Sequence, residues 1–185
     1  MKNLFYFLWG KAIKRELAVK HQMNVKTTIS MGEDVSCSVP CYLDADAVYM
    51  SKKAVYLYTV RGDSITTDFK ISQISQIADV ITGLRELDVK KPEDFDEQIS
   101  RYSCFLCFAI LAAAAEGSHF SAVRDLKETI RNSLHNEEIK KADFENITLK
   151  SRITIALMKK QKIRLAFYFL YLCKKLRYIK RGGKK

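Results

Sequence analysis

The chain has little proline or glycine, with 2 Pro and 7 Gly among 185 residues. Because these residues mark turns and loops, long irregular segments are not expected and the composition favours helices. No stretch reaches the roughly 18–20 consecutive apolar residues of a membrane span. The longest run, residues 104–115, is typical of a buried helix. A signal peptide is not indicated, since the apolar run at residues 4–9 is short and lacks a small-residue cleavage site.

Acidic residues are absent after Glu145, whereas residues 147–185 carry 13 Lys and Arg. The overall charge of +11 therefore belongs to this C-terminal segment, and the rest of the chain has a net charge of −2. Such a segment favours an anionic surface as its partner. The hydrophobic content of 48% is enough for a core and excludes wholesale disorder.

The five cysteines form an odd set in apolar surroundings: Cys37, Cys41, Cys104, Cys107 and Cys173. This pattern indicates buried free thiols in a reducing compartment better than a disulfide framework. A zinc or redox site at Cys104-x-x-Cys107 is the weaker alternative, because no His lies nearby. We therefore predict no metal site.

Periodicity predicts a mixed first part and a helical remainder. Helices are expected at residues 12–20, from Gly32, and at 71–84, 92–116 and 118–134, then from Asn136, and from residue 146 or 148 to about 181. Pro40 is expected to kink or shorten the second of these. Short strands rich in Val and Tyr are expected at 47–50 and 54–60.

Three segments resemble the second half of family-two glycosyltransferases. Residues 8–17 (LWGKAIKREL) are similar to a Trp- and Lys-containing segment of that family, and residues 32–35 (GEDV) to its Glu-Asp motif at a helix start. Residues 55–66 (VYLYTVRGDSIT) resemble its aromatic strand, Arg-containing turn and Ser-Ile-Thr. Their order and spacing carry more weight than any single segment.

The resemblance implies an α+β fold. Residues 1–68 would be the acceptor-side portion of a GT-A domain with two short strands. Residues 69–146 would form a helical region, and 147–185 a basic amphipathic helix and tail. The family's donor-binding half is not recognisable, since Asp44-Ala45-Asp46 matches the family's Asp-x-Asp motif in letters but lies after the Glu-Asp motif. We therefore expect a truncated gene product, an isolated domain or a split protein.

By the same resemblance, the chain belongs to an inverting glycosyltransferase of cell-envelope polysaccharide or glycolipid synthesis. Such an enzyme transfers a sugar from a nucleotide-sugar to an acceptor hydroxyl, and a carboxylate accepts the proton. Asp34 would be the general base and Glu33 its orienting neighbour. Substrate-binding residues would be Arg61, Trp9, Lys11 and Tyr58. The complete enzyme would use Mg²⁺ or Mn²⁺, and this chain alone would bind neither and be inactive.

These residues also have plainer interpretations. Acids at a helix start stabilise the helix dipole, a turn Arg can be a surface residue, and Trp9 in an apolar run can belong to the core. Thr59, Pro40 and the Gly62-Asp63 turn depart from the family pattern. The sequence therefore does not decide whether the charges on the acceptor side match those of the family.

The C-terminal helix suggests peripheral attachment to a membrane. Basic and aromatic residues alternate along it without an acid, as in helices that lie in a membrane interface. We expect cytoplasmic localisation at the inner face of the membrane. The alternative is a helix packed on the body with its basic face in solvent. The expected membrane contacts are Lys162, Arg164, Phe167, Phe169, Lys174, Lys175 and Arg177.

Two further functions compete with the enzyme. One is a non-catalytic membrane-surface interaction protein derived from the same fold. The other is nucleic-acid binding, which we do not expect because the body is near neutral and lacks a motif. The apolar segment at residues 4–9 predicts self-association.

Overall fold

A computed structural model describes residues 8–22, 25, 29, 32–51, 53, 55–57, 59, 70–131, 134–145 and 147–180. All regular secondary structure in these residues is helical. The elements, in chain order, are α1 (Arg15–Gln22), α2 (Glu33–Leu43), α3 (Ser72–Glu86), α4 (Phe95–Glu116), the 3₁₀ helix η3 (Phe120–Ala122), α5 (Val123–Arg131), α6 (His135–Lys141), α7 (Leu149–Lys159) and α8 (Ile163–Lys180).

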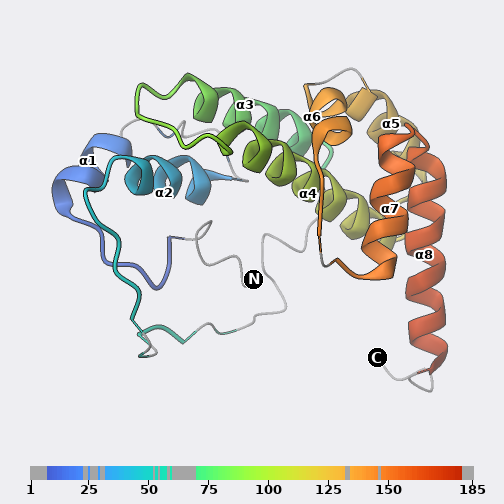
Figure 1. Ribbon diagram of the computed structural model, residues 1–185. Coiled ribbons are helices and arrows are strands. Elements are labelled where there is room, and N and C mark those ends of the chain that lie inside the picture. Colours follow the sequence, from blue (N-terminus) through green and yellow to red (C-terminus); the bar gives the residue numbers. More distant parts are fainter. Residues whose placement is uncertain are drawn as a thin grey trace.

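The predicted α+β fold is wrong for the described residues. Residues 47–50 form no strand, and neither do 55–57 and 59, the described part of the second expected strand. They run as an extended trace away from α1 and α2 (Figure 1). A strand is stable when its backbone groups and side chains find neighbours. Here Tyr49 is 93% exposed and Leu57 88%, so these side chains lack the packing that a strand needs.

Helix α4 is the centre of the core. It packs against α3, α6, α7 and α8, and α2 joins α3 to α1 (Figure 1). The periodic apolar face predicted for α3 is confirmed, because Ile74, Ile77, Ile81 and Leu84 are buried there. Among the described residues, α4 is long and apolar enough to cross a membrane, but 61% of that window is buried within the protein. Such burial is typical of a core helix.

The single long C-terminal helix predicted from sequence is instead two helices. Thr148 caps α7 by accepting a hydrogen bond from the Ser151 backbone N–H, as expected for one of the two proposed starts. The chain then turns between α7 and α8, where Gln161 has a φ of 57°. Met158 and Ile163 on either side of the turn are fully buried. Burial of both flanks therefore overrides the helix propensity of the intervening Lys and Gln residues.

Candidate functional site

Helix α2 begins with the two acids that the sequence singled out. Gly32 precedes it with a φ of 93°, and its carbonyl accepts hydrogen bonds from the backbone N–H and Oγ of Ser36. A Cβ at Gly32 would lie 3.0 Å from a methyl group of Val80 on α3, so both backbone conformation and space require glycine here. Glu33 and Asp34 therefore stand at a defined helix N-terminus, as predicted.

The carboxyl group of Glu33 has a raised pKa. Burial raises its pKa, the charge of Asp34 raises it further, and hydrogen bonds to the backbone of Glu33 and Gly32 oppose this. The net effect is a pKa above the usual value of 4.5. The neighbouring carboxylate of Asp34 thus adds to the effect of burial on Glu33, and a raised carboxyl pKa is common at proton-transfer sites.

Lys11 interacts electrostatically with Asp34. Burial lowers its pKa below 10.5, and the carboxylate of Asp34 acts in the opposite direction. Its ammonium group is 5.8 Å from the ring centre of Tyr42 on α2, at cation–π distance. The charge of Asp34 therefore acts on both Lys11 and Glu33, which places the three residues in one electrostatic neighbourhood.

An aromatic pair adjoins this group. Trp9 stacks on Tyr56, with ring centres 5.4 Å apart and planes inclined by 22°. Gly10 between Trp9 and Lys11 has a φ of 73°, which lets the chain turn from the ring pair to the charged group. Trp9 and Lys11, both predicted as substrate-binding, are two residues apart in the chain. Trp9 contacts Tyr56, and Lys11 contacts Tyr42. Arg61 and Tyr58, also predicted as substrate-binding, lie outside the described residues.

Sequence reasoning missed Tyr42 and Tyr56 as site residues. Tyr56 was part of the aromatic segment that carried the resemblance, but its contact with Trp9 spans a sequence separation that no local pattern reveals. Tyr42 also borders an apolar pocket of ≈ 320 Å³ between α2 and α4, lined by Val35, Val39, Phe95 and Ile99 among others. Tyr42 therefore lies between the ammonium group of Lys11 and this apolar pocket.

Asp44 has a structural role at the other end of α2. Its carboxylate accepts hydrogen bonds from Lys20 at 2.6 Å and from His21 at 3.0 Å, which tie α1 to α2. These bonds hold the pKa of Asp44 below its usual value. Across the described residues, no group of three or more His, Cys, Asp or Glu is arranged to hold a metal ion.

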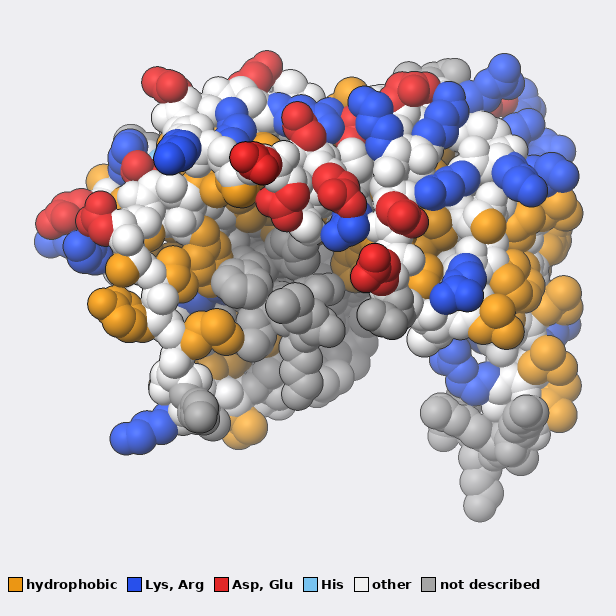
Figure 2. Space-filling view, in the orientation of Figure 1, with side chains coloured by type: hydrophobic (Ala, Val, Ile, Leu, Met, Phe, Trp, Pro, Cys, Tyr) orange, Lys and Arg blue, Asp and Glu red, His pale blue; other side chains and the backbone are white. Residues whose placement is uncertain are grey.

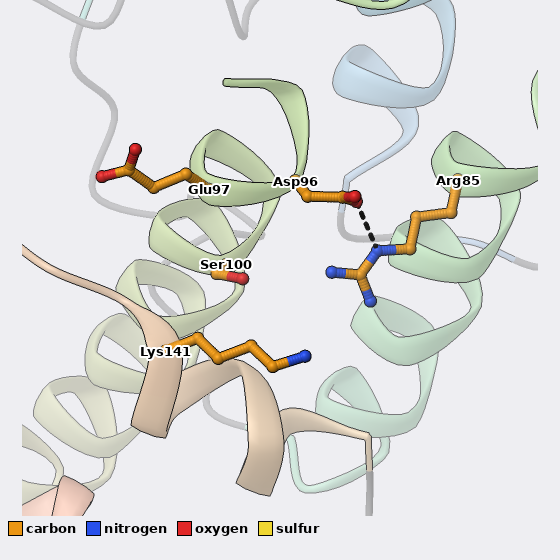
Figure 3. Close-up of a pocket in the computed structure, with 5 residues that line it drawn as sticks. All are labelled: Arg85, Asp96, Glu97, Ser100 and Lys141. Atoms are coloured by element: carbon orange, nitrogen blue, oxygen red, sulfur yellow. Dashed lines mark hydrogen bonds and ion pairs between the residues drawn. The ribbon is translucent and has the colours of Figure 1, made fainter. Parts of the chain in front are cut away.

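A second polar constellation joins α3, α4 and α6, and the sequence analysis missed it. Arg85, Asp96, Glu97, Ser100 and Lys141 line a pocket of ≈ 450 Å³, in which Asp96 bonds Arg85 and Lys141 extends toward the guanidinium (Figure 3). The buried carboxylate of Glu138 binds the same guanidinium and accepts a hydrogen bond from Ser100 at 2.6 Å. Because Arg85 is paired with both Asp96 and Glu138, the cluster suits stabilisation of the fold.

Fully buried His135 extends this polar network. Its Nε2–H donates to the carbonyl of Ile74 at 2.9 Å, so its Nδ1 accepts the hydrogen bond from Ser103 Oγ at 2.7 Å. Burial lowers the pKa of His135 below 6.5, against opposing effects of Ile74 and Glu138. Both Ser103 and His135 are 0% exposed, so a substrate has no access to this pair.

The predicted membrane contacts have mixed positions. Phe167 is wrong as a contact, because it is fully buried and packs edge-on against Phe120. Lys174 is partly buried, and its ammonium is held by the carbonyl of Glu116 and lies near Ser118 Oγ. Phe169 is half-buried. The remaining predicted contacts, exposed to solvent, are Lys162, Arg164, Lys175 and Arg177.

Comparisons with family models, curated proteins and solved structures find no match for this chain. The resemblance to family-two glycosyltransferases therefore stays a prediction. The α+β fold that the resemblance implied is wrong for the described residues. The functional part of the prediction depends on the positions of Trp9, Lys11, Glu33 and Asp34.

Proposed function

We propose that this chain carries the acceptor-binding side of a glycosyltransferase acting on a glycolipid or cell-envelope glycan. The observation that supports this most is the electrostatic coupling of Lys11 to Asp34 at the start of α2, together with the stacked rings of Trp9 and Tyr56 next to Lys11 in the chain. Aromatic faces suit the apolar faces of sugar rings, and adjacent charged groups suit hydroxyls. The apolar pocket bordering Tyr42 favours an acceptor with an apolar portion.

In the proposed reaction an acceptor hydroxyl attacks the anomeric carbon of a nucleotide-sugar. A C–O bond forms with inversion, the bond to the diphosphate breaks, and the hydroxyl proton passes to a carboxylate. Asp34 is the proposed base. Glu33, with its raised pKa, shares the proton, and Lys11 orients the acceptor oxygen. The raised pKa brings Glu33 closer to the working pH of a general base.

The residues described do not fit the divalent metal site of the implied family. No ligand group of sufficient size is present among them, and Asp44, the first acid of the Asp-x-Asp look-alike, is bound to Lys20 and His21. We propose that other polypeptide supplies the donor site, and that the described residues alone are inactive.

A titration followed by tryptophan fluorescence tests the acceptor site. Trp9 is the single tryptophan of the chain, so its emission reports directly on ligands that stack at the ring pair. We expect methyl glycosides at millimolar concentration to shift this emission saturably, and Asp34→Asn to weaken the binding at least threefold. Glu16→Gln, which changes an exposed acid in the first turn of α1, is the matched control. Identical binding by all three proteins, or no saturable shift, would contradict the proposal.

A non-catalytic membrane-surface protein is the second candidate. It is favoured by the apolar side chains that α8 exposes to solvent. This candidate predicts membrane binding without glycoside binding, so the titration separates the two functions.

A further inference from the structure

Helix α8 has two apolar faces, and one of them is largely exposed to solvent. The inner face packs into the core through Ile163, Ala166, Phe167 and Leu170. On the opposite side, five apolar residues follow one another at intervals of three or four, which places them on one face of a helix. Their exposed fractions are Leu165 54%, Tyr168 47%, Leu172 56%, Leu176 60% and Ile179 69%.

These five residues form what we call the outer stripe of α8. The stripe runs about 20 Å along the helix axis. Hydrophobic side chains line the edge of the molecule where α8 lies, beside Lys and Arg side chains (Figure 2). Soluble monomers rarely expose a continuous apolar surface of this length without a partner.

The positive charge beside the outer stripe indicates which kind of partner covers it. Arg164, Lys175 and Arg177 are exposed on the same helix, and neither α7 nor α8 contains an acidic residue. Packing two copies through α8 would bring these cations together with no carboxylate from either helix to pair them. An anionic lipid surface instead accepts the apolar side chains and the cations together.

We propose that α8 lies in the interface of an anionic membrane, with Leu165, Leu172 and Leu176 inserted among the acyl chains. Arg164 and Lys175 reach the lipid phosphates, and Tyr168 suits the boundary because its ring is apolar and its hydroxyl polar. Phe167 and Lys174, which the sequence predicts as membrane contacts, are not among the inserted or phosphate-binding residues because the protein itself contacts both. This membrane contact goes beyond the proposed function and does not depend on it.

Co-sedimentation of the full chain with vesicles tests this inference. We expect binding to phosphatidylcholine vesicles that contain phosphatidylserine, and much weaker binding to phosphatidylcholine alone. Leu172→Asn with Leu176→Asn is expected to reduce binding at least tenfold. Val19→Asn, which alters an apolar side chain on α1 that is 53% exposed, is the matched control and is expected to bind like the wild type. Arg164→Gln is expected to reduce binding about fivefold.

Circular dichroism establishes that each variant is folded, as expected because every altered side chain is exposed. Failure of the folded wild type to bind anionic vesicles would overturn the proposal. Equal losses for the α8 double variant and Val19→Asn would overturn it too. Light scattering that shows a dimer dispersed by the α8 variant, without vesicle binding, would assign the stripe to a second copy of the chain instead.

Discussion

Arg85 on α3 and Glu138 on α6 are joined by two hydrogen bonds, of 2.6 and 2.9 Å, across a sequence separation of 53 residues. The side chain of Glu138 is 1% exposed, whereas that of Arg85 is 27% exposed. The guanidinium therefore reaches inward from the surface to neutralise a carboxylate that the core would otherwise hold alone. This pair connects the second and third quarters of the chain.

Removal of the Arg85 guanidinium is expected to destabilise the protein strongly. Arg85→Met leaves Glu138 buried with Ser100 as its remaining hydrogen-bond partner, at a cost of about 3–5 kcal/mol in the free energy of unfolding. Arg124→Met, which removes an exposed ion pair with Glu128, should cost less than about 1 kcal/mol. Urea denaturation followed by circular dichroism measures both. Similar costs for the two variants would show that the Arg85–Glu138 pair stabilises the fold no more than an exposed ion pair does.

Stability is expected to fall as the solution becomes more acidic. Burial lowers the pKa of His135, so the folded state resists its protonation and loses stability as the pH falls below about 6.5. Burial alone would raise the pKa of Glu138, but hydrogen bonds from Arg85 and Ser100 outweigh it and hold the pKa below 4.5. Its contribution is present above that pH and is lost as the pH falls further.

Urea denaturation over a pH series measures this dependence. His135→Gln should flatten the fall that begins near pH 6.5 and leave the one below pH 4.5 in place. A free energy of unfolding that rises between neutral pH and pH 5 in the wild type would contradict the sign of this prediction.

Two glycines are expected to respond oppositely to alanine. Gly32 has a φ of 93° and would place a Cβ 3.0 Å from Val80, so Gly32→Ala should cost about 1–2 kcal/mol. Gly83 lies inside α3, and a Cβ there would meet nothing within 4 Å. Gly83→Ala should therefore stabilise the protein by about 0.5–1 kcal/mol. Thermal unfolding of both variants checks the pair, and a shift of the same sign in both would refute the local geometry.

Thiol reactivity should distinguish one cysteine from the others. Burial raises the pKa of Cys104 to about 12 and that of Cys41 to about 11, where the charge of Cys37 adds to the effect. Cys173 is partly exposed, whereas the other four cysteines are buried. We expect one fast-reacting thiol in the folded protein and five after denaturation, measured with a chromogenic disulfide reagent. Cys173→Ser should remove the fast reaction, and its persistence would contradict the predicted burial.

The helical part of the fold could largely be predicted because its signals are local. The apolar period in α3, the Gly after α4 and the Thr148 cap are each visible within a few residues. The strand predictions at residues 47–50 and 54–60 failed because β-propensity depends on neighbours, and Tyr49 and Leu57 remain almost fully exposed. The break at Gln161 also escaped prediction, since tertiary burial of its flanks determines it.

The candidate site divides in the same way. A helix start with two acids can be predicted from Gly32-Glu33-Asp34, and the structure places it there. The approach of Lys11 to Tyr42 and the stack of Trp9 on Tyr56 join distant segments, so spacing cannot predict them. Likewise, the outward face of α8 becomes visible once the structure shows which side the core covers.

The central claim is that a sugar acceptor binds at Trp9, Lys11 and the start of α2. The most direct measurement is a two-dimensional ¹H–¹⁵N NMR titration of the full chain with methyl glycosides. The account predicts shifts at the Trp9 indole and at the backbone amides of Lys11, Glu33 and Asp34, while Arg85 and Ser100 of the other pocket stay unchanged. Shifts confined to that second pocket, or no shifts at millimolar glycoside, would contradict it.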